Sequence, residues 1–197
     1  MTNYEMLDKM LSDGKGIVQT SDVVKAGISK PVFYKYARER KLDQAAHGIY
    51  IAPDAWTDSM YILHLRYPQV IFSHDTALYL HDMTDREPTR YTVTVKTGYN
   101  PSHLSAANIK AYSIKKELYP LGLTSAETPF GNSVPVYDAE RTVCDIVRSR
   151  NTIEVQVLQD MLKSYFRRKN KDLRRLMQYS HMLGVEKILR NYMGVLL

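Results

Sequence analysis

The chain has 197 residues, 44% of them hydrophobic, which is enough for one large core or two small ones. Its formal net charge of +6 suits a polyanionic partner. The single cysteine, Cys144, excludes an intrachain disulfide and a multi-cysteine zinc site. Because no stretch has the apolar length of a signal peptide or a membrane span, we expect a cytoplasmic protein without a membrane partner.

The first third of the chain has a pattern of short helices and strands. Residues 3 to 11 place apolar side chains on one helical face, and Ile17 and Val18 form a short apolar strand. A helix to Ala26 follows, with Thr20 and Ser21 as candidate N-caps. The next helix covers residues 30 to 41, with Gly27 in the preceding turn.

Two further features complete this pattern. Ser29 stands where it can cap the second helix, and Pro31 lies in the first turn of that helix, where a missing N–H costs nothing. Residues 42 to 46 and 49 to 52 then read as two strands around His47-Gly48. This order predicts a winged helix-turn-helix, in which the hairpin is the wing.

The second helix of this motif has one cationic face. On a helical wheel its basic residues lie opposite Val32, Phe33 and Tyr36, with Glu39 and Arg40 as interruptions. The second helix of a helix-turn-helix enters the DNA major groove. An ordinary solvated charged face is the alternative, which the surrounding motif makes less favourable. The predicted DNA-binding residues are Ser21, Ser29, Lys30, Tyr34, Lys35, Arg38, Lys41, Gln44 and His47.

The rest of the chain mixes strands and helices, so we expect an α+β fold with two domains. The boundary is placed at Pro53 to Trp56, giving a winged helix-turn-helix domain over 1–53 and a mixed α+β domain over 56–197 with a helical C-terminal bundle. Helices are expected at 58–67, 73–81, 139–148, 152–168, 172–182 and 185–197, and strands at 70–72, 90–97, 109–114, 123–128 and 134–137.

Basic residues are concentrated at the C-terminal end. Residues 148 to 197 carry 11 basic and 4 acidic side chains, against 8 and 6 in residues 1 to 52. A group this dense suits a second nucleic-acid contact or an acidic partner surface, with a solvated basic surface as the alternative. This basic cluster consists of Lys163, Arg167, Arg168, Lys169, Lys171, Arg174 and Arg175.

Three segments resemble a known family in their order and spacing: HGIYIAP, FSHDTALYLHDM and VPVYDAERTVCDIVR. With them the chain resembles the AbiEi family of antitoxins and autorepressors from type IV toxin-antitoxin systems of abortive phage infection. The resemblance implies that the first domain binds inverted repeats in its own promoter. It also implies that the second domain counters a nucleotidyltransferase-like toxin without a stable complex.

The chemical candidates are weaker. Ser73, His74 and Asp75 have triad residue types, but neighbours at a helix start are expected to point apart, so Ser73 reads as a helix cap. His74 and His81 lack the HExxH spacing of a zinc site. No phosphate-binding glycine loop or nucleophile-elbow motif occurs.

One helix carries several charged residues. Arg141 and Asp145 stand at i and i+4 and can form a pair. Together with Asp138 and Glu140 they have the residue types of a nuclease carboxylate cluster, but no accompanying metal-binding strand is evident. Cys144 lies between apolar residues of the same helix and is expected in the core.

We therefore predict a DNA-binding transcriptional repressor and antitoxin without catalytic activity, cofactor or metal. Its partners are double-stranded operator DNA with inverted repeats and the toxin, and the pattern leaves open a monomer that binds DNA cooperatively. The alternative is a nucleic-acid-processing enzyme, a nuclease or transferase domain fused to a winged-helix DNA reader.

Overall fold

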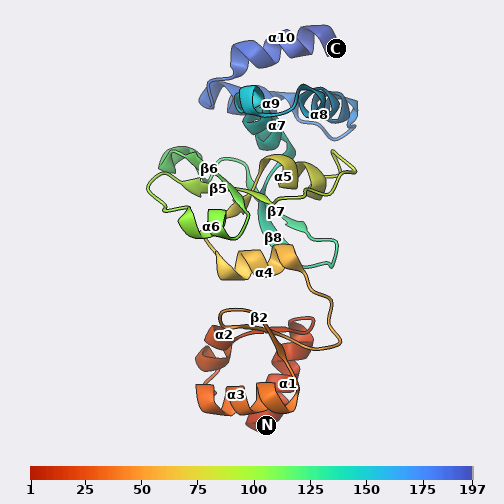
Figure 1. Cartoon of the computed structure of the whole chain (residues 1–197). Helices are drawn as coiled ribbons and strands as arrows, with labels where there is room; N and C mark the ends of the chain where they lie inside the picture. Colours follow the sequence, from red (N-terminus) through yellow and green to blue (C-terminus); the bar gives the residue numbers. More distant parts are fainter. Residues whose placement is uncertain (197) are drawn as a thin grey trace. The chain divides into compact units, whose positions relative to one another are not determined.

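The computed structural model describes residues 1–196 and confirms the predicted α+β fold class (Figure 1). The chain divides into two compact units, Met1–Pro68 and Gln69–Leu197, and each is described by itself. Within the described residues, no helix combines the length and the apolar character needed to cross a membrane.

The first unit consists of helices around a small antiparallel sheet. The sheet has the order β1-β3-β2, and Gly48, at φ 72°, lies in the turn between β2 and β3. Its elements are α1 (Asn3–Asp13), β1 (Ile17–Gln19), α2 (Thr20–Lys25), α3 (Lys30–Glu39), β2 (Asp43–Ala46), β3 (Ile49–Ile51) and α4 (Ser59–Arg66).

The first three helices share one apolar core. Leu7 of α1, Val23 of α2 and Phe33 of α3 are fully or almost fully buried within it. Gly27, at φ 86°, turns the chain between α2 and α3, a conformation that glycine adopts without steric cost. The core therefore fixes which face of α3 points inward.

Helix α4 belongs to the first unit rather than to the second. Tyr61, Ile62 and Leu65 pack against an apolar cluster in which Ile17 and Ile49 are buried. The sequence-based boundary at residues 53 to 56 therefore lies one helix before the division at Pro68. A change in composition marks a linker, whereas the division depends on the tertiary contacts of α4.

The second unit has a five-stranded mixed sheet and a group of helices (Figure 1). Its strands are β4 (Ile71–Phe72), β5 (Thr92–Lys96), β6 (Lys110–Ile114), β7 (Leu123–Glu127) and β8 (Ser133–Tyr137). Its helices are α5 (His74–Leu80), α6 (Ser102–Ala106), α7 (Ala139–Arg148), α8 (Val155–Arg167), α9 (Leu173–Met182) and α10 (Glu186–Leu196), with short 3-10 turns η1 (Lys116–Leu118) and η2 (Arg150–Thr152).

The sheet has the order β6-β5-β4-β8-β7. At one edge of the sheet, β6 runs parallel to β5. At the other edge, β7 and β8 form an antiparallel hairpin. Helix α7 packs against α5, α8 and α9, so it connects the sheet side of the unit with the C-terminal helices. Val143, Ile146 and Val147 of α7 are completely buried in that core.

Most predicted elements occur within a few residues of their expected positions, and the helix at 139–148 is confirmed at both ends. Helix α6 and the 3-10 turn η1 were not predicted, because their residues show no clear periodic pattern. The predicted cap of α2 is wrong: the helix begins at Thr20, Gln19 occupies the cap position, and no side chain caps it. Ser29 and Ser73 occupy cap positions, but their side chains make no capping bond.

Arg141 is the most connected side chain of α7. It is completely buried, its Nε donates to Asp145 Oδ2 at 2.9 Å, and its guanidinium lies 4.2 Å from the ring centre of Tyr137. Its Nη1 donates to the carbonyl oxygens of Leu118 and Leu121 at 2.8 and 2.9 Å. The predicted pair with Asp145 is thus confirmed, and Arg141 also holds the turn before β7.

Gly122 in that turn lies close to Arg141. Gly122 has φ +74°, and a Cβ built there would lie 2.6 Å from Arg141 Cβ. Gly184 has a similar φ of +71° with no atom within 4 Å of such a Cβ. Alanine substitutions at the two glycines therefore allow the cost of backbone strain to be distinguished from the cost of steric overlap.

We predict that Gly122→Ala destabilises the protein clearly more than Gly184→Ala. The left-handed conformation costs about 1–2 kcal/mol at either position, and overpacking against Arg141 adds about 1–3 kcal/mol at Gly122 alone. Urea unfolding of the two variants measures the difference. Equal decreases in unfolding free energy would show that the packing against Arg141 relaxes without cost.

Candidate functional site

The predicted DNA-binding residues share one property in the first unit. Every one of these nine side chains is exposed. The opposite face of α3 is covered, because Phe33, Tyr36 and Ala37 are buried. The structure therefore sorts α3 into an apolar inner face and a polar outer face, as its sequence predicts.

The outer face of α3 carries a stripe of functional groups. Lys30, Tyr34 and Arg38 are spaced four residues apart, which places them on one side of the helix. Lys41 follows the helix end with a left-handed backbone at φ 54°. Lys35 lies beside the stripe and has a long contact of 3.9 Å with Glu39. The stripe presents cations and a phenol hydroxyl, which are groups that bind phosphate oxygens and base edges.

Glu39 and Arg40 interrupt the basic pattern for a structural reason. Glu39 accepts a hydrogen bond of 2.7 Å from the Tyr4 hydroxyl, and Arg40 forms a 2.8 Å ion pair with Asp8. Asp8 also accepts a 2.6 Å bond from the Tyr36 hydroxyl, and burial with this bond raises the pKa of Tyr36 to about 12. These residues hold α3 on α1.

The hairpin and α2 supply the remaining candidates. Gln44 of β2 is paired with Tyr50 of β3, and a bulge follows between Gln44 and Ala46. The ring of Tyr50 lies 6.4 Å from that of Tyr34, so the hairpin and the stripe on α3 are neighbours. Ser21 donates its hydroxyl hydrogen to Gln19 at 3.2 Å, an exposed bond that a phosphate oxygen can replace.

The basic cluster in the second unit separates into two groups. Arg168 donates to the backbone oxygen of His81, Lys171 donates to the Arg168 carbonyl, and Arg175 contacts Asp172 and Asp138. The other four are exposed and form no ion pair within the described chain: Lys163, Arg167, Lys169 and Arg174. These four therefore have side chains free to meet an external anion.

Ser73, His74 and Asp75 differ from the sequence-based expectation. His74 has a left-handed backbone, φ 49°, and its Nδ1 lies 3.0 Å from Ser73 Oγ, so the expectation that all three side chains diverge is wrong for this pair. Its Nε2 lies 3.1 Å from Ser149 Oγ. Burial and nearby cations lower the pKa of His74 to about 3, which makes the imidazole a weak base.

The histidines and carboxylates of the quoted motifs have structural partners. His81 Nε2 lies 2.6 Å from the Tyr137 carbonyl oxygen, whereas the ring nitrogens of His74 lie beside serine hydroxyls. Glu140 accepts hydrogen bonds from the Tyr165 hydroxyl and the Asp172 N–H, both at 3.0 Å. Among residues 1–196, no group of three or more histidine, cysteine or acidic side chains is arranged to hold a metal ion.

Asp138 and Cys144 also lie within the packing of α7. The Asp138 carboxylate caps α7 by accepting from the Arg141 N–H at 2.8 Å. Cys144 is completely buried, and burial raises the pKa of its thiol, which makes a reactive thiolate unfavourable. The expectation that Cys144 is a core residue is confirmed.

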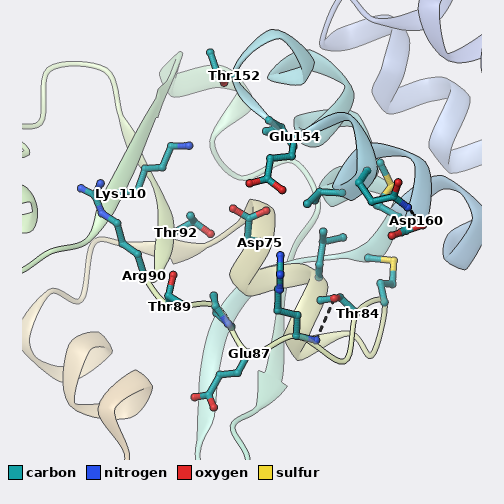
Figure 2. Close-up of a pocket in the computed structure, with 18 residues that line it drawn as sticks. Asp75, Thr84, Glu87, Thr89, Arg90, Thr92, Lys110, Thr152, Glu154 and Asp160 are labelled. Carbon is teal, nitrogen blue, oxygen red and sulfur yellow. Dashed lines mark hydrogen bonds between the residues drawn. The ribbon is translucent and has the colours of Figure 1, made fainter.

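A cavity of the second unit was not predicted from the sequence. The cavity has a volume of about 720 Å³ and is lined by the 83–90 loop, β5, β6 and the start of α8. Figure 2 shows the carboxylates of Asp75 and Glu154 pointing toward each other across it. Burial raises the pKa of Asp75, Lys110 opposes this shift and Glu154 adds to it. Its lining comes from distant segments, so no local motif marks it.

Comparisons with known proteins give a fold relationship only. No protein-family model matches the chain, and no curated protein matches it. One similar solved structure is that of the RV2827C protein from Mycobacterium tuberculosis, with a TM-score of 0.52 and 12% sequence identity. The match covers 98% of this chain and 82% of that chain. At this identity the match shows a shared fold.

The burial of His74 leads to a prediction about acid sensitivity. Its folded pKa, about 3, lies below the ordinary value of 6.5, so the unfolded chain binds more protons between these pH values. This contribution to stability is complete above pH 6.5 and is lost as the pH falls toward 3. His74→Asn, which tolerates the left-handed backbone, should make the unfolding free energy rise less with increasing pH in this window.

Urea unfolding of wild type and His74→Asn at several pH values tests this expectation. Asp145 contributes with the opposite sign, because burial raises its pKa to about 6, but it is present in both proteins. An unchanged slope in the variant would mean that His74 is not the group that titrates.

Proposed function

We propose that the protein is a cytoplasmic DNA-binding autorepressor and antitoxin, and that its first unit acts as a winged helix-turn-helix. The observation that carries the proposal is the exposed stripe of Lys30, Tyr34 and Arg38 on the second of two consecutive helices, beside an antiparallel hairpin. In this arrangement α3 enters the major groove, and the β2–β3 hairpin contacts the flanking backbone.

The nine exposed residues divide between two kinds of contact. Lys30 and Arg38 are suited to guanine acceptors or to phosphates, and Tyr34 donates its hydroxyl hydrogen. Ser21 and Ser29, at the start of α2 and α3, are placed for phosphate contacts, and Gln44 and His47 extend these contacts from the hairpin. The operator is then an inverted repeat read by two copies.

The antitoxin part of the proposal rests on the resemblance of three sequence segments to AbiEi proteins. In the second unit, the DAERTVCD segment forms α7 with its cap and supports the helices around it. We infer that α7 organises the second unit. The exposed surface of that unit then counters the nucleotidyltransferase-like toxin in a phage-defence system. No stable complex with the toxin is required.

We predict that Lys30→Ala with Arg38→Ala removes specific operator binding and leaves the fold intact. Removing each base-specific hydrogen-bonding group costs about 1–3 kcal/mol, so affinity should fall roughly 30-fold or more. Both side chains are exposed, so the unfolding free energy should change by less than about 0.5 kcal/mol each. Fluorescence anisotropy with the promoter fragment measures the affinity.

The matched control is Lys9→Ala with Lys25→Ala, which removes the same charge from exposed positions on α1 and α2. This control should keep its sequence preference. Equal decreases in affinity in both double variants would show that net charge, not the α3 stripe, drives binding. Growth of toxin-expressing cells tests the antitoxin role, which the α3 variant should retain.

The four free cations of the basic cluster support a second nucleic-acid contact. Replacing Lys163, Arg167, Lys169 and Arg174 with Gln should make the slope of log K against log salt shallower by about 0.9 for each phosphate that is no longer neutralised. Specific and nonspecific affinity should fall together. An unchanged salt slope with abolished toxin protection would assign the cluster to the antitoxin role instead.

The enzyme alternative is favoured by one observation, the cavity with facing Asp75 and Glu154 carboxylates (Figure 2). A raised pKa in one of two facing carboxyl groups is common to acid–base sites. Incubating labelled DNA and RNA with the protein and Mg²⁺ or Mn²⁺ tests it. Product formation that Asp75→Asn abolishes would replace the antitoxin proposal by an enzymatic one.

A further inference from the structure

A second cavity of the second unit combines a buried arginine with hydroxyl groups. It has a volume of about 240 Å³ and lies where the strands β5 and β6 meet the C-terminal end of α7. Its lining includes His74, Tyr112, Arg141, Asp145, Arg148 and Ser149. They come from separate segments of the chain, so no sequence motif marks them as a set.

Two buried donors in this lining have no protein acceptor. Arg141 Nη2 and the Tyr112 hydroxyl are both buried, and within the described chain neither has a hydrogen-bond partner. The other guanidinium nitrogens of Arg141 are held by Asp145 and two backbone carbonyls. A buried donor without an acceptor costs about 1–3 kcal/mol, so the fold retains two unfavourable groups beside one cavity.

The charge of the lining is positive. Arg141 and Asp145 compensate each other through the 2.9 Å contact, and Arg148 at the rim is exposed and has no ion pair within residues 1–196. His74 is neutral because its pKa is lowered to about 3. Arg148 therefore leaves one net positive charge at the rim of the cavity.

We propose that this cavity binds the phosphoryl group of a small phosphorylated ligand, with Arg141 Nη2, Tyr112 Oη and Arg148 as its donors. Arginine and hydroxyl donors approach from β6 and α7, which matches an anion with three or four outward oxygens better than a planar carboxylate. The volume equals roughly eight waters at 30 Å³ each, which exceeds one phosphate ion and leaves room for a short ester group.

The site is built for binding rather than for acyl transfer. Ser149 Oγ lies 3.1 Å from His74 Nε2, a distance suited to nucleophile activation. However, the imidazole partner on the other side is Ser73, whose Oγ also accepts from Thr94, and the low pKa of His74 makes it a weak base. This hydrogen-bonded chain orients the cavity wall.

Calorimetric titration of the full-length protein tests the proposal with inorganic phosphate, glycerol 3-phosphate and acetate at constant ionic strength. Tyr112→Phe and Arg148→Gln should each weaken phosphate or glycerol 3-phosphate binding about tenfold, since each removes a hydrogen bond to a charged ligand. Tyr112→Phe should not lower the melting temperature, because its hydroxyl has no hydrogen-bond partner among residues 1–196.

Arg174→Gln is the matched control, because it removes an exposed arginine of the basic cluster and not a cavity residue. If glycerol 3-phosphate binds more tightly than inorganic phosphate, the ligand is a phosphate ester. If inorganic phosphate binds more tightly, the ligand is the free ion. Either result supports the site. If Arg174→Gln weakens binding as much as Arg148→Gln, an adventitious ion only is bound. That result, no binding, or acetate binding with the same variant dependence overturns the proposal. DNA binding through α3 is independent of every outcome.

Discussion

The burial of one guanidinium group determines much of the second unit. Arg141 has no exposed surface, and its bonds to Asp145, Leu118 and Leu121 connect α7 with the turn before β7. A charge removed from water needs such partners, since an isolated buried ion costs several kcal/mol. The close approach of Gly122 and the stacking of Tyr137 follow from this position. Within the described residues the same side chain has one nitrogen without a partner, so its structural role and its proposed binding role arise from a single placement.

Local patterns predicted the elements well, and long-range contacts account for the differences. Helix α7 was placed correctly because Asp138 caps it and its apolar residues repeat with helical spacing, both of which are local signals. The outer face of α3 was predicted for the same reason. The assignment of α4 to the first unit was not predicted, because it depends on the cluster around Ile17 and Ile49, which residues far apart in sequence form. The two cavities are likewise assembled from distant segments.

Arginine residues in this chain illustrate why residue type alone does not assign a role. Arg38 projects from α3, Arg40 holds α3 on α1, and Arg141 is enclosed by α7 and its neighbours. In the basic cluster, Arg168 donates to a backbone carbonyl, while Arg174 is exposed and forms no ion pair with the part of the chain that the structure describes. A count of basic residues therefore overstates the charge available to a polyanion. The difference between these arginines lies in the acceptors that folding brings near them, which composition does not report.

The packing of α4 has a consequence for the evolution and engineering of the first unit. Tyr61, Ile62 and Leu65 cover apolar side chains of the small sheet, so a fragment that ends at Pro53 would expose Ile17, Ile49 and Ile51 to water. Such a patch promotes self-association. The transferable module is therefore the 68-residue unit with its fourth helix, and a recombination that exchanges the first unit between proteins of this fold is best tolerated after Pro68.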